Sequence, residues 1–142
     1  MPRSAKKLDR LLRVRTLQLG QVQGEEARAR ARVDHEEALR QRIAGLAANV
    51  SPRATPAPTS ATSLIAAAHY RERLQQSAHA AEQRVAVAEQ GLDAARAATR
   101  DARRDQSAIE KLIAREQAEA ALKALRELEE LPPSGRNRHD LC

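Results

Sequence analysis

Residues 51–60 read SPRATPAPTS, and this stretch decides the fold. Proline fixes its own φ, lacks an N–H, and pushes the residue before it out of the helical conformation. Ser51 stands directly before Pro52, and two more prolines follow within six residues. Apolar residues recur with a helical period on both sides of this stretch. The sequence therefore predicts a turn at 51–60 between two helices, residues 4–50 and 61–131.

The first helical stretch carries apolar residues at steps of four and three. Nine of the thirteen residues that these steps visit are apolar, which is typical of a coiled-coil seam. Two of the polar members, Glu36 and Arg40, are also spaced for an i,i+4 ion pair. The thirteen are Leu8, Leu12, Arg15, Leu19, Val22, Glu26, Ala29, Val33, Glu36, Arg40, Ile43, Ala47 and Val50.

The second stretch has a longer seam, rich in alanine. It consists of Leu64, Ala67, Arg71, Leu74, Ala78, Ala81, Val85, Ala88, Leu92, Ala95, Thr99, Ala102, Gln106, Ile109 and Ile113. Beyond it the pattern changes register, and Leu122, Leu125, Leu128 and Leu131 carry the apolar face. Pro132 and Pro133 stop the helix, so residues 132–142 are predicted to be a disordered tail.

Composition favours long helices over a compact domain. The chain has 30 alanines, one Tyr and no Phe or Trp, so it lacks the large side chains that build a globular core. Alanine, Leu, Glu, Arg and Gln are strong helix formers. The predicted fold is all-α: a two-helix antiparallel coiled-coil hairpin over residues 1–131, with the C-terminal helix longer.

The unequal lengths of the helices predict a surface for a partner. If Val50 lies opposite residue 60, then Leu8 lies opposite about residue 102. Residues 103–131 then extend beyond the first helix while still carrying leucines, including Leu122 and Leu125. Because helices bury their apolar stripes against something, this overhang is expected to bind another protein.

The net charge of +6 is concentrated at the N-terminus, where residues 3–15 hold six basic residues and a single acid, Asp9. Five of the six fall within an arc of about 120° opposite the leucine stripe. The arc can be a solvated face, or it can bind an acidic protein or an anionic membrane surface. Nucleic acid is disfavoured because no aromatic residues accompany these charges. The five are Arg3, Lys6, Lys7, Arg10 and Arg13.

No catalytic, cofactor or metal motif is present in the sequence. The four histidines are scattered, and the single cysteine, Cys142, is the last residue. No apolar run reaches the length of a membrane span, and the N-terminus lacks a signal-peptide core. We therefore expect a cytoplasmic protein that is not an enzyme, with no cofactor, no metal and no small-molecule substrate.

Three segments resemble the flagellar export protein FliJ family. Residues 8–15, LDRLLRVR, resemble the Leu-x-x-Leu-Leu-x-x-Arg start of that family. Residues 109–116, IEKLIARE, resemble its Leu-Glu-Lys-Leu-x-x-Arg segment. Tyr70 and Leu74 stand where the family places an aromatic residue and a leucine early in the second helix. The resemblance extends over residues 4–131 in length and helix order.

The resemblance implies a stalk and general chaperone of the flagellar type III export apparatus, located at the inner face of the cell membrane. Its implied partners are the export ATPase, the cytoplasmic domain of the export gate and export chaperones. Tyr70 and Leu74 would touch the gate, and the basic arc and leucine overhang would engage the ATPase. Ser77 and Ala81 depart from the family's gate-facing pattern, and residues 129–133 replace its usual Leu-Asp-Glu ending.

Two other functions stay open from the residues. One is a generic coiled-coil scaffold that self-associates through residues 103–131. The other is a peripheral membrane or nucleic-acid binder that uses the basic N-terminus.

Overall fold

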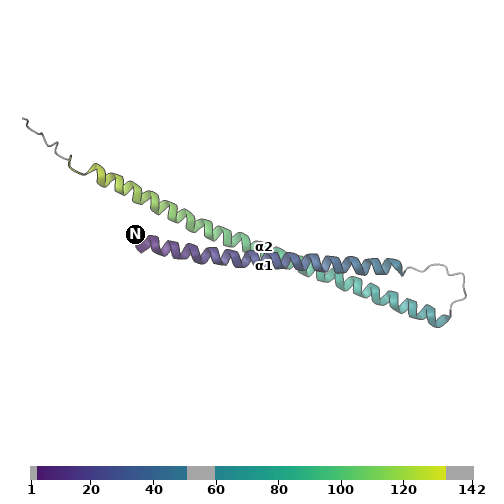
Figure 1. Cartoon of the computed structure of the whole chain (residues 1–142). Coiled ribbons are helices and arrows are strands. Elements are labelled where there is room, and N and C mark those ends of the chain that lie inside the picture. Colours follow the sequence, from purple (N-terminus) through teal and green to yellow (C-terminus); the bar gives the residue numbers. More distant parts are fainter. Residues whose placement is uncertain (1–2, 51–59, 134–142) are drawn as a thin grey trace, which may run out of the picture. The chain divides into compact units, whose positions relative to one another are not determined.

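Two long helices make up the computed structural model, which describes residues 3–50 and 60–133. Helix α1 spans Arg3–Asn49 and α2 spans Ala61–Glu129, with 47 and 69 residues. They pack against each other as an antiparallel hairpin, and no strand occurs in the described ranges (Figure 1). This confirms the predicted all-α hairpin with the longer second helix.

The helix ends lie within two residues of their predicted positions. Helix α2 begins after Ser60, whose Oγ accepts a hydrogen bond from the Ser63 N–H at 3.3 Å and so caps the first turn. It ends at Glu129, a few residues before Pro132. Of the predicted turn at 51–60 and the predicted tail at 132–142, residues 51–59 and 134–142 lie outside the described residues.

Contacts divide the chain into two compact parts, and each part contains a segment of both helices. We call residues 17–103 the middle part. Residues 1–16 together with 104–142 form the terminal part.

Cross-helix bonds set the register of the middle part. Arg84 of α2 and Glu36 of α1 form an ion pair at 3.1 Å, and the Thr99 hydroxyl lies 3.5 Å from the Val22 carbonyl oxygen. This register places Ala29 opposite Leu92, and both are buried. A small residue opposite a large one keeps the two backbones close while filling the space between them.

Cross-helix bonds between described residues pair the two helices of the terminal part. Ile109, at 9% exposure, is buried on the α2 side of this seam. The bonds join Ser4 to Glu116, Arg15 to Asp105 at 2.9 Å, and Gln106 to Thr16 at 3.1 Å.

The predicted overhang of residues 103–131 is therefore too long. Residues 105–116 of α2 bond to or pack on α1, and the uncovered segment begins only at Gln117. From Gln117 to Pro133 every residue is exposed. Figure 1 shows this end of α2 continuing past the beginning of α1.

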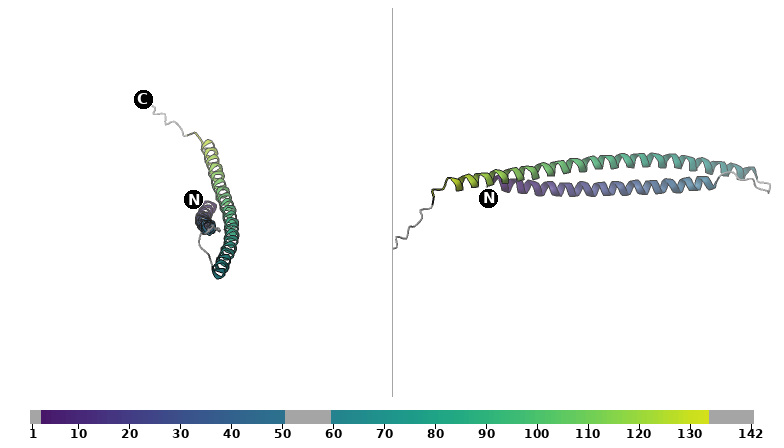
Figure 2. Two further views of the ribbon diagram at one scale, coloured as in Figure 1. Left: turned by 90° about the vertical axis from the view of Figure 1, so that its right-hand side faces the viewer. Right: turned by 90° about the horizontal axis from the view of Figure 1, so that it is seen from above.

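The excess length of α2 is divided between its two ends. In the middle part, residues 61–66 are all exposed, and Ala67 is the first partly buried residue of α2. The prediction that the two helix ends lie level at the turn is therefore wrong. The pairing of side chains along the seam sets a different register, in which α2 also begins beyond the end of α1 at Asn49. Figure 2 shows the two helices side by side from a second direction.

The predicted seams are otherwise correct. On α1 every seam residue except Arg40 is at least partly buried, and on α2 every one except Leu64. Arg40 turns its guanidinium to Glu37, and Leu64 lies in the segment that α1 does not reach.

Candidate partner-binding surfaces

The uncovered end of α2 carries an apolar surface that we call the leucine face. It consists of Leu122, Leu125 and Leu128, with Ala118 and Ala121 between them. The three leucines are 55%, 55% and 64% exposed. Leu131, just beyond the helix end, is also exposed. The predicted exposure of Leu122 and Leu125 is confirmed, while their role as binding residues stays a prediction.

The leucine face does not continue the intramolecular seam. At about 100° per residue, it lies about 150° around α2 from the seam residues Ile109, Ile113 and Glu116. The seam itself would continue through Ala120, Lys123 and Glu127. Two of these residues are charged and the third is small, whereas a coiled-coil seam needs large apolar residues. The leucines therefore turn away from the side of α2 that α1 occupies, and only another molecule or another segment can cover them.

One edge of the leucine face is charged. Helical spacing places Arg115, Glu119, Arg126 and Glu129 along this edge, and all four are exposed. Lys123 and Glu127 lie elsewhere on the helix, 3.9 Å apart. The face therefore has an apolar centre bordered by both signs of charge.

The basic arc of α1 lies in the terminal part. All five predicted residues, Arg3, Lys6, Lys7, Arg10 and Arg13, are exposed. None of them forms an ion pair with another residue in the described ranges. Val14, 49% exposed, lies within the same arc by helical spacing. A cationic surface with an exposed aliphatic residue suits an acidic partner.

Tyr70 and Leu74 lie one turn apart near the beginning of α2. Tyr70 is 49% exposed, whereas Leu74 is partly buried in the seam. Leu46 and Ile65 are also exposed in the middle part and are not among the predicted site residues. Both are large apolar residues outside the predicted seams, and this position alone could have identified them as exposed.

A shallow groove runs along the middle part between the helices. The groove is lined by Val87, Ala88 and Gly91 of α2 and by the paired Arg84 and Glu36. Val87 is 67% exposed, and a Cβ at Gly91 would meet no atom within 4 Å. The groove is open, and it holds no constellation of groups suited to chemistry.

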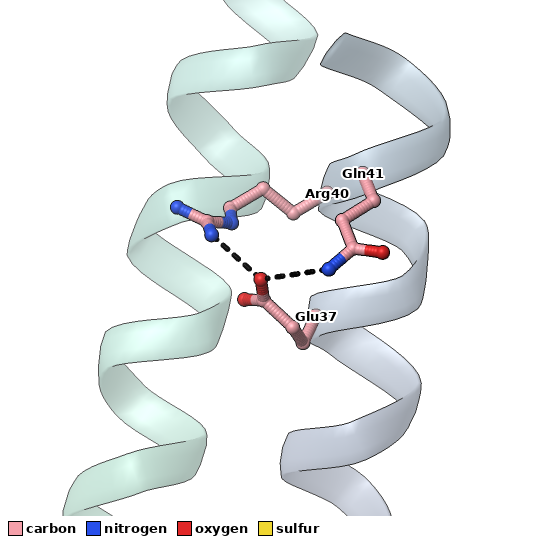
Figure 3. A network of polar contacts seen from close by, with 3 residues as sticks. All are labelled: Glu37, Arg40 and Gln41. Atoms are coloured by element: carbon pink, nitrogen blue, oxygen red, sulfur yellow. Dashed lines mark hydrogen bonds and ion pairs between the residues drawn. The ribbon is translucent and has the colours of Figure 1, made fainter. Parts of the chain in front are cut away.

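A polar network on α1 corrects one predicted ion pair. Glu37 accepts hydrogen bonds from Arg40 at 2.6 Å and from Gln41 at 3.3 Å (Figure 3). Chiefly because of the Arg40 bond, the pKa of the Glu37 carboxyl is lower than its ordinary value. Arg40 was predicted to pair with Glu36, but Glu36 bonds instead to Arg84 across the seam.

Within residues 3–50 and 60–133, no group of three or more His, Cys, Asp or Glu side chains is arranged to hold a metal ion. His79 contacts Gln83 on its own helix, 3.1 Å away. Neither described helix is long and apolar enough to cross a membrane.

No family model, curated protein or solved structure matches the chain.

Proposed function

We propose that this protein is a stalk-like adaptor and general chaperone of the flagellar type III export apparatus, linking the export ATPase to the export gate. The observation that supports this most is the position of the two longest segments that resemble the FliJ family. Residues 8–15 and 109–116 are about one hundred residues apart in the chain, and the register set by the Ser4–Glu116 and Arg15–Asp105 bonds brings residues 8–11 opposite residues 109–112. Leu12 and Ile109 belong to their shared seam.

The proposed mechanism is binding without chemistry. In it, the leucine face and the basic arc engage the ATPase, because both lie in the terminal part and offer apolar area and positive charge. Apolar burial supplies affinity, and the charges orient the partner and speed its approach. Tyr70, with the partly buried Leu74, would contact the cytoplasmic domain of the gate. On this proposal the protein works in the cytoplasm at the inner face of the membrane, and export chaperones are further partners.

A binding assay with purified partners tests the proposal. The full chain should bind both the export ATPase and the cytoplasmic domain of the gate. The Leu122→Gln/Leu125→Gln variant should lose ATPase binding at least tenfold and keep gate binding. Tyr70→Ala should show the reverse preference.

A matched control is available on the same helix turns. Ala120→Gln/Lys123→Gln has the same spacing but lies on the side of α2 away from the leucine face. Glutamine is a good helix former, so circular dichroism should be unchanged in both double variants. If the unmodified chain binds neither partner, the proposed function is wrong.

A further inference from the structure

We infer that the leucine face binds the leucine face of a second copy of this chain, with the two α2 ends antiparallel. This goes beyond the proposed function, because it assigns a different occupant to the face and does not depend on the export apparatus. The self-association predicted for residues 103–131 is thereby confined to residues 115–129, which carry the leucine face and its charged edge on the side of α2 away from α1.

The sizes of the apolar side chains on the leucine face suit an antiparallel pair. Ala118, Ala121, Leu125 and Leu128 follow the alternating steps of three and four of a coiled-coil seam. In an antiparallel pair, Leu125 of one copy lies opposite Ala121 of the other, and Leu128 lies opposite Ala118. Every layer then joins a large residue to a small one, which packs two helices closely and leaves few voids. Leu122 of each copy meets Leu122 of the other at the edge of this core.

The charged edge of the leucine face is also complementary to itself in an antiparallel pair. In the same antiparallel register, Arg115 of one copy lies opposite Glu129 of the other, and this pair occurs twice by symmetry. Arg126 similarly approaches Glu119. A parallel pair would turn this charged edge of one helix away from the same edge of the other, so it would form neither of these pairs. All four side chains are exposed in the single chain, and no bond among the described residues occupies them.

The leucine face is accessible to a second chain. Because the leucine face points about 150° away from the seam, α1 does not stand in the path of a second helix. The three leucines are each more than half exposed, so their apolar area is available for burial. Dimerisation and ATPase binding would use the same face and would therefore exclude each other.

Sedimentation equilibrium tests the inference on the full chain carrying Cys142→Ser, which removes the only thiol. Over a roughly hundredfold range of concentration, the protein should pass from monomer to dimer. Leu122→Gln/Leu125→Gln should raise the dissociation constant at least tenfold, while Ala120→Gln/Lys123→Gln should leave it within about twofold. A monomer at all concentrations would overturn the inference, and so would equal effects of the two double variants.

Cysteine cross-linking tests the orientation in the same background. Ala118→Cys and Leu128→Cys chains should form a disulfide with each other when mixed, and neither should do so alone. In an antiparallel pair, two copies of residue 118 lie about 15 Å apart, which is too far for a disulfide. If each variant cross-links to itself instead, the pair is parallel and the proposed register is wrong.

Discussion

Arg84 of α2 donates a hydrogen bond to Glu36 of α1, with Nε and Oε2 3.1 Å apart. Both side chains are partly exposed, so this ion pair is worth only about 0.2–1 kcal/mol in stability. Its value lies in marking the register of the middle part. In that register, Ile43 lies opposite Ala78, and both are partly buried.

A disulfide test checks this register directly. In the Cys142→Ser background, Ile43→Cys with Ala78→Cys should cross-link rapidly under mild oxidation. Ile43→Cys with Ala67→Cys should not, because residue 67 lies about 16 Å further along α2 than residue 78. If the helix ends were level at the turn, the second pair would cross-link rapidly. That result would contradict the register of the middle part.

Much of the fold was predictable because a helical period of apolar residues is a strong signal. The seams followed from steps of four and three, such as Leu8 to Leu12 and Val85 to Ala88, and nearly all their members are at least partly buried. The register was not predicted correctly, because level helix ends were assumed at the turn. Matching small residues to large ones, as with Ala29 and Leu92, was a criterion available in the sequence.

The candidate surfaces were also predictable only in part from the sequence. The exposure of Leu122 and Leu125 was predictable, since both fall off the seam pattern. The extent of the uncovered segment depended on the register, so its beginning was placed 14 residues too early, at 103 instead of 117. Side-chain pairing was also ambiguous in the sequence: Glu36 had Arg40 within reach on its own helix but bonds to Arg84 on the other.

Enlarging a buried alanine should destabilise the middle part. Ala81 is fully buried, so a leucine there must push the helices apart. We expect Ala81→Leu to cost about 1–3 kcal/mol of unfolding free energy. The control, Ala86→Leu, places the same side chain on an exposed position of α2 and should change stability by less than about 0.5 kcal/mol. Urea unfolding followed by circular dichroism measures both, and equal costs would argue against close approach at Ala81.

Removing a buried aliphatic should have a local effect in the terminal part. Ile109 is 9% exposed and Leu112 is 44% exposed, three residues along the same helix. Ile109→Ala should cost about 2–4 kcal/mol, and Leu112→Ala about half of that or less. The check is hydrogen exchange of amides in residues 105–116, which should accelerate strongly only in Ile109→Ala. A larger effect of Leu112→Ala would mean that Leu112, and not Ile109, lies on the face of α2 that packs against α1.

Thr99 should tolerate loss of its hydroxyl. It is 4% exposed, and its Oγ1 donates a hydrogen bond to the Ala95 carbonyl oxygen at 3.1 Å. The Val22 carbonyl oxygen lies 3.5 Å from the same Oγ1, near the limit for a hydrogen bond. Both carbonyls also accept from their own helices, so Thr99→Val keeps the volume and leaves no buried acceptor without a donor. We expect a change within about 1 kcal/mol in unfolding free energy. A loss above about 2 kcal/mol would show that the contact with Val22 is a strong cross-helix bond.

The Glu37 carboxyl should make one contribution to stability depend on pH. Its pKa in the folded chain lies below its ordinary value, chiefly because Arg40 donates a hydrogen bond to the ionised form. A group with a lowered folded pKa stabilises the fold above its unfolded pKa, about 4.3 for Glu. That contribution is lost as the pH falls from there through the folded pKa, and it is constant at neutral pH.

The measurement is a carboxyl titration of Glu37 by carbon-detected NMR in the folded chain. Glu37 should titrate below the ordinary glutamate range, and Arg40→Gln should move its midpoint upward. Gln41→Ala should move it in the same direction by less, because the Gln41 bond is longer, at 3.3 Å against 2.6 Å, and carries no charge. Arg40→Lys is a useful intermediate, since it keeps the charge but loses the planar guanidinium. An unchanged midpoint in Arg40→Gln would show that the bond in Figure 3 does not persist in solution.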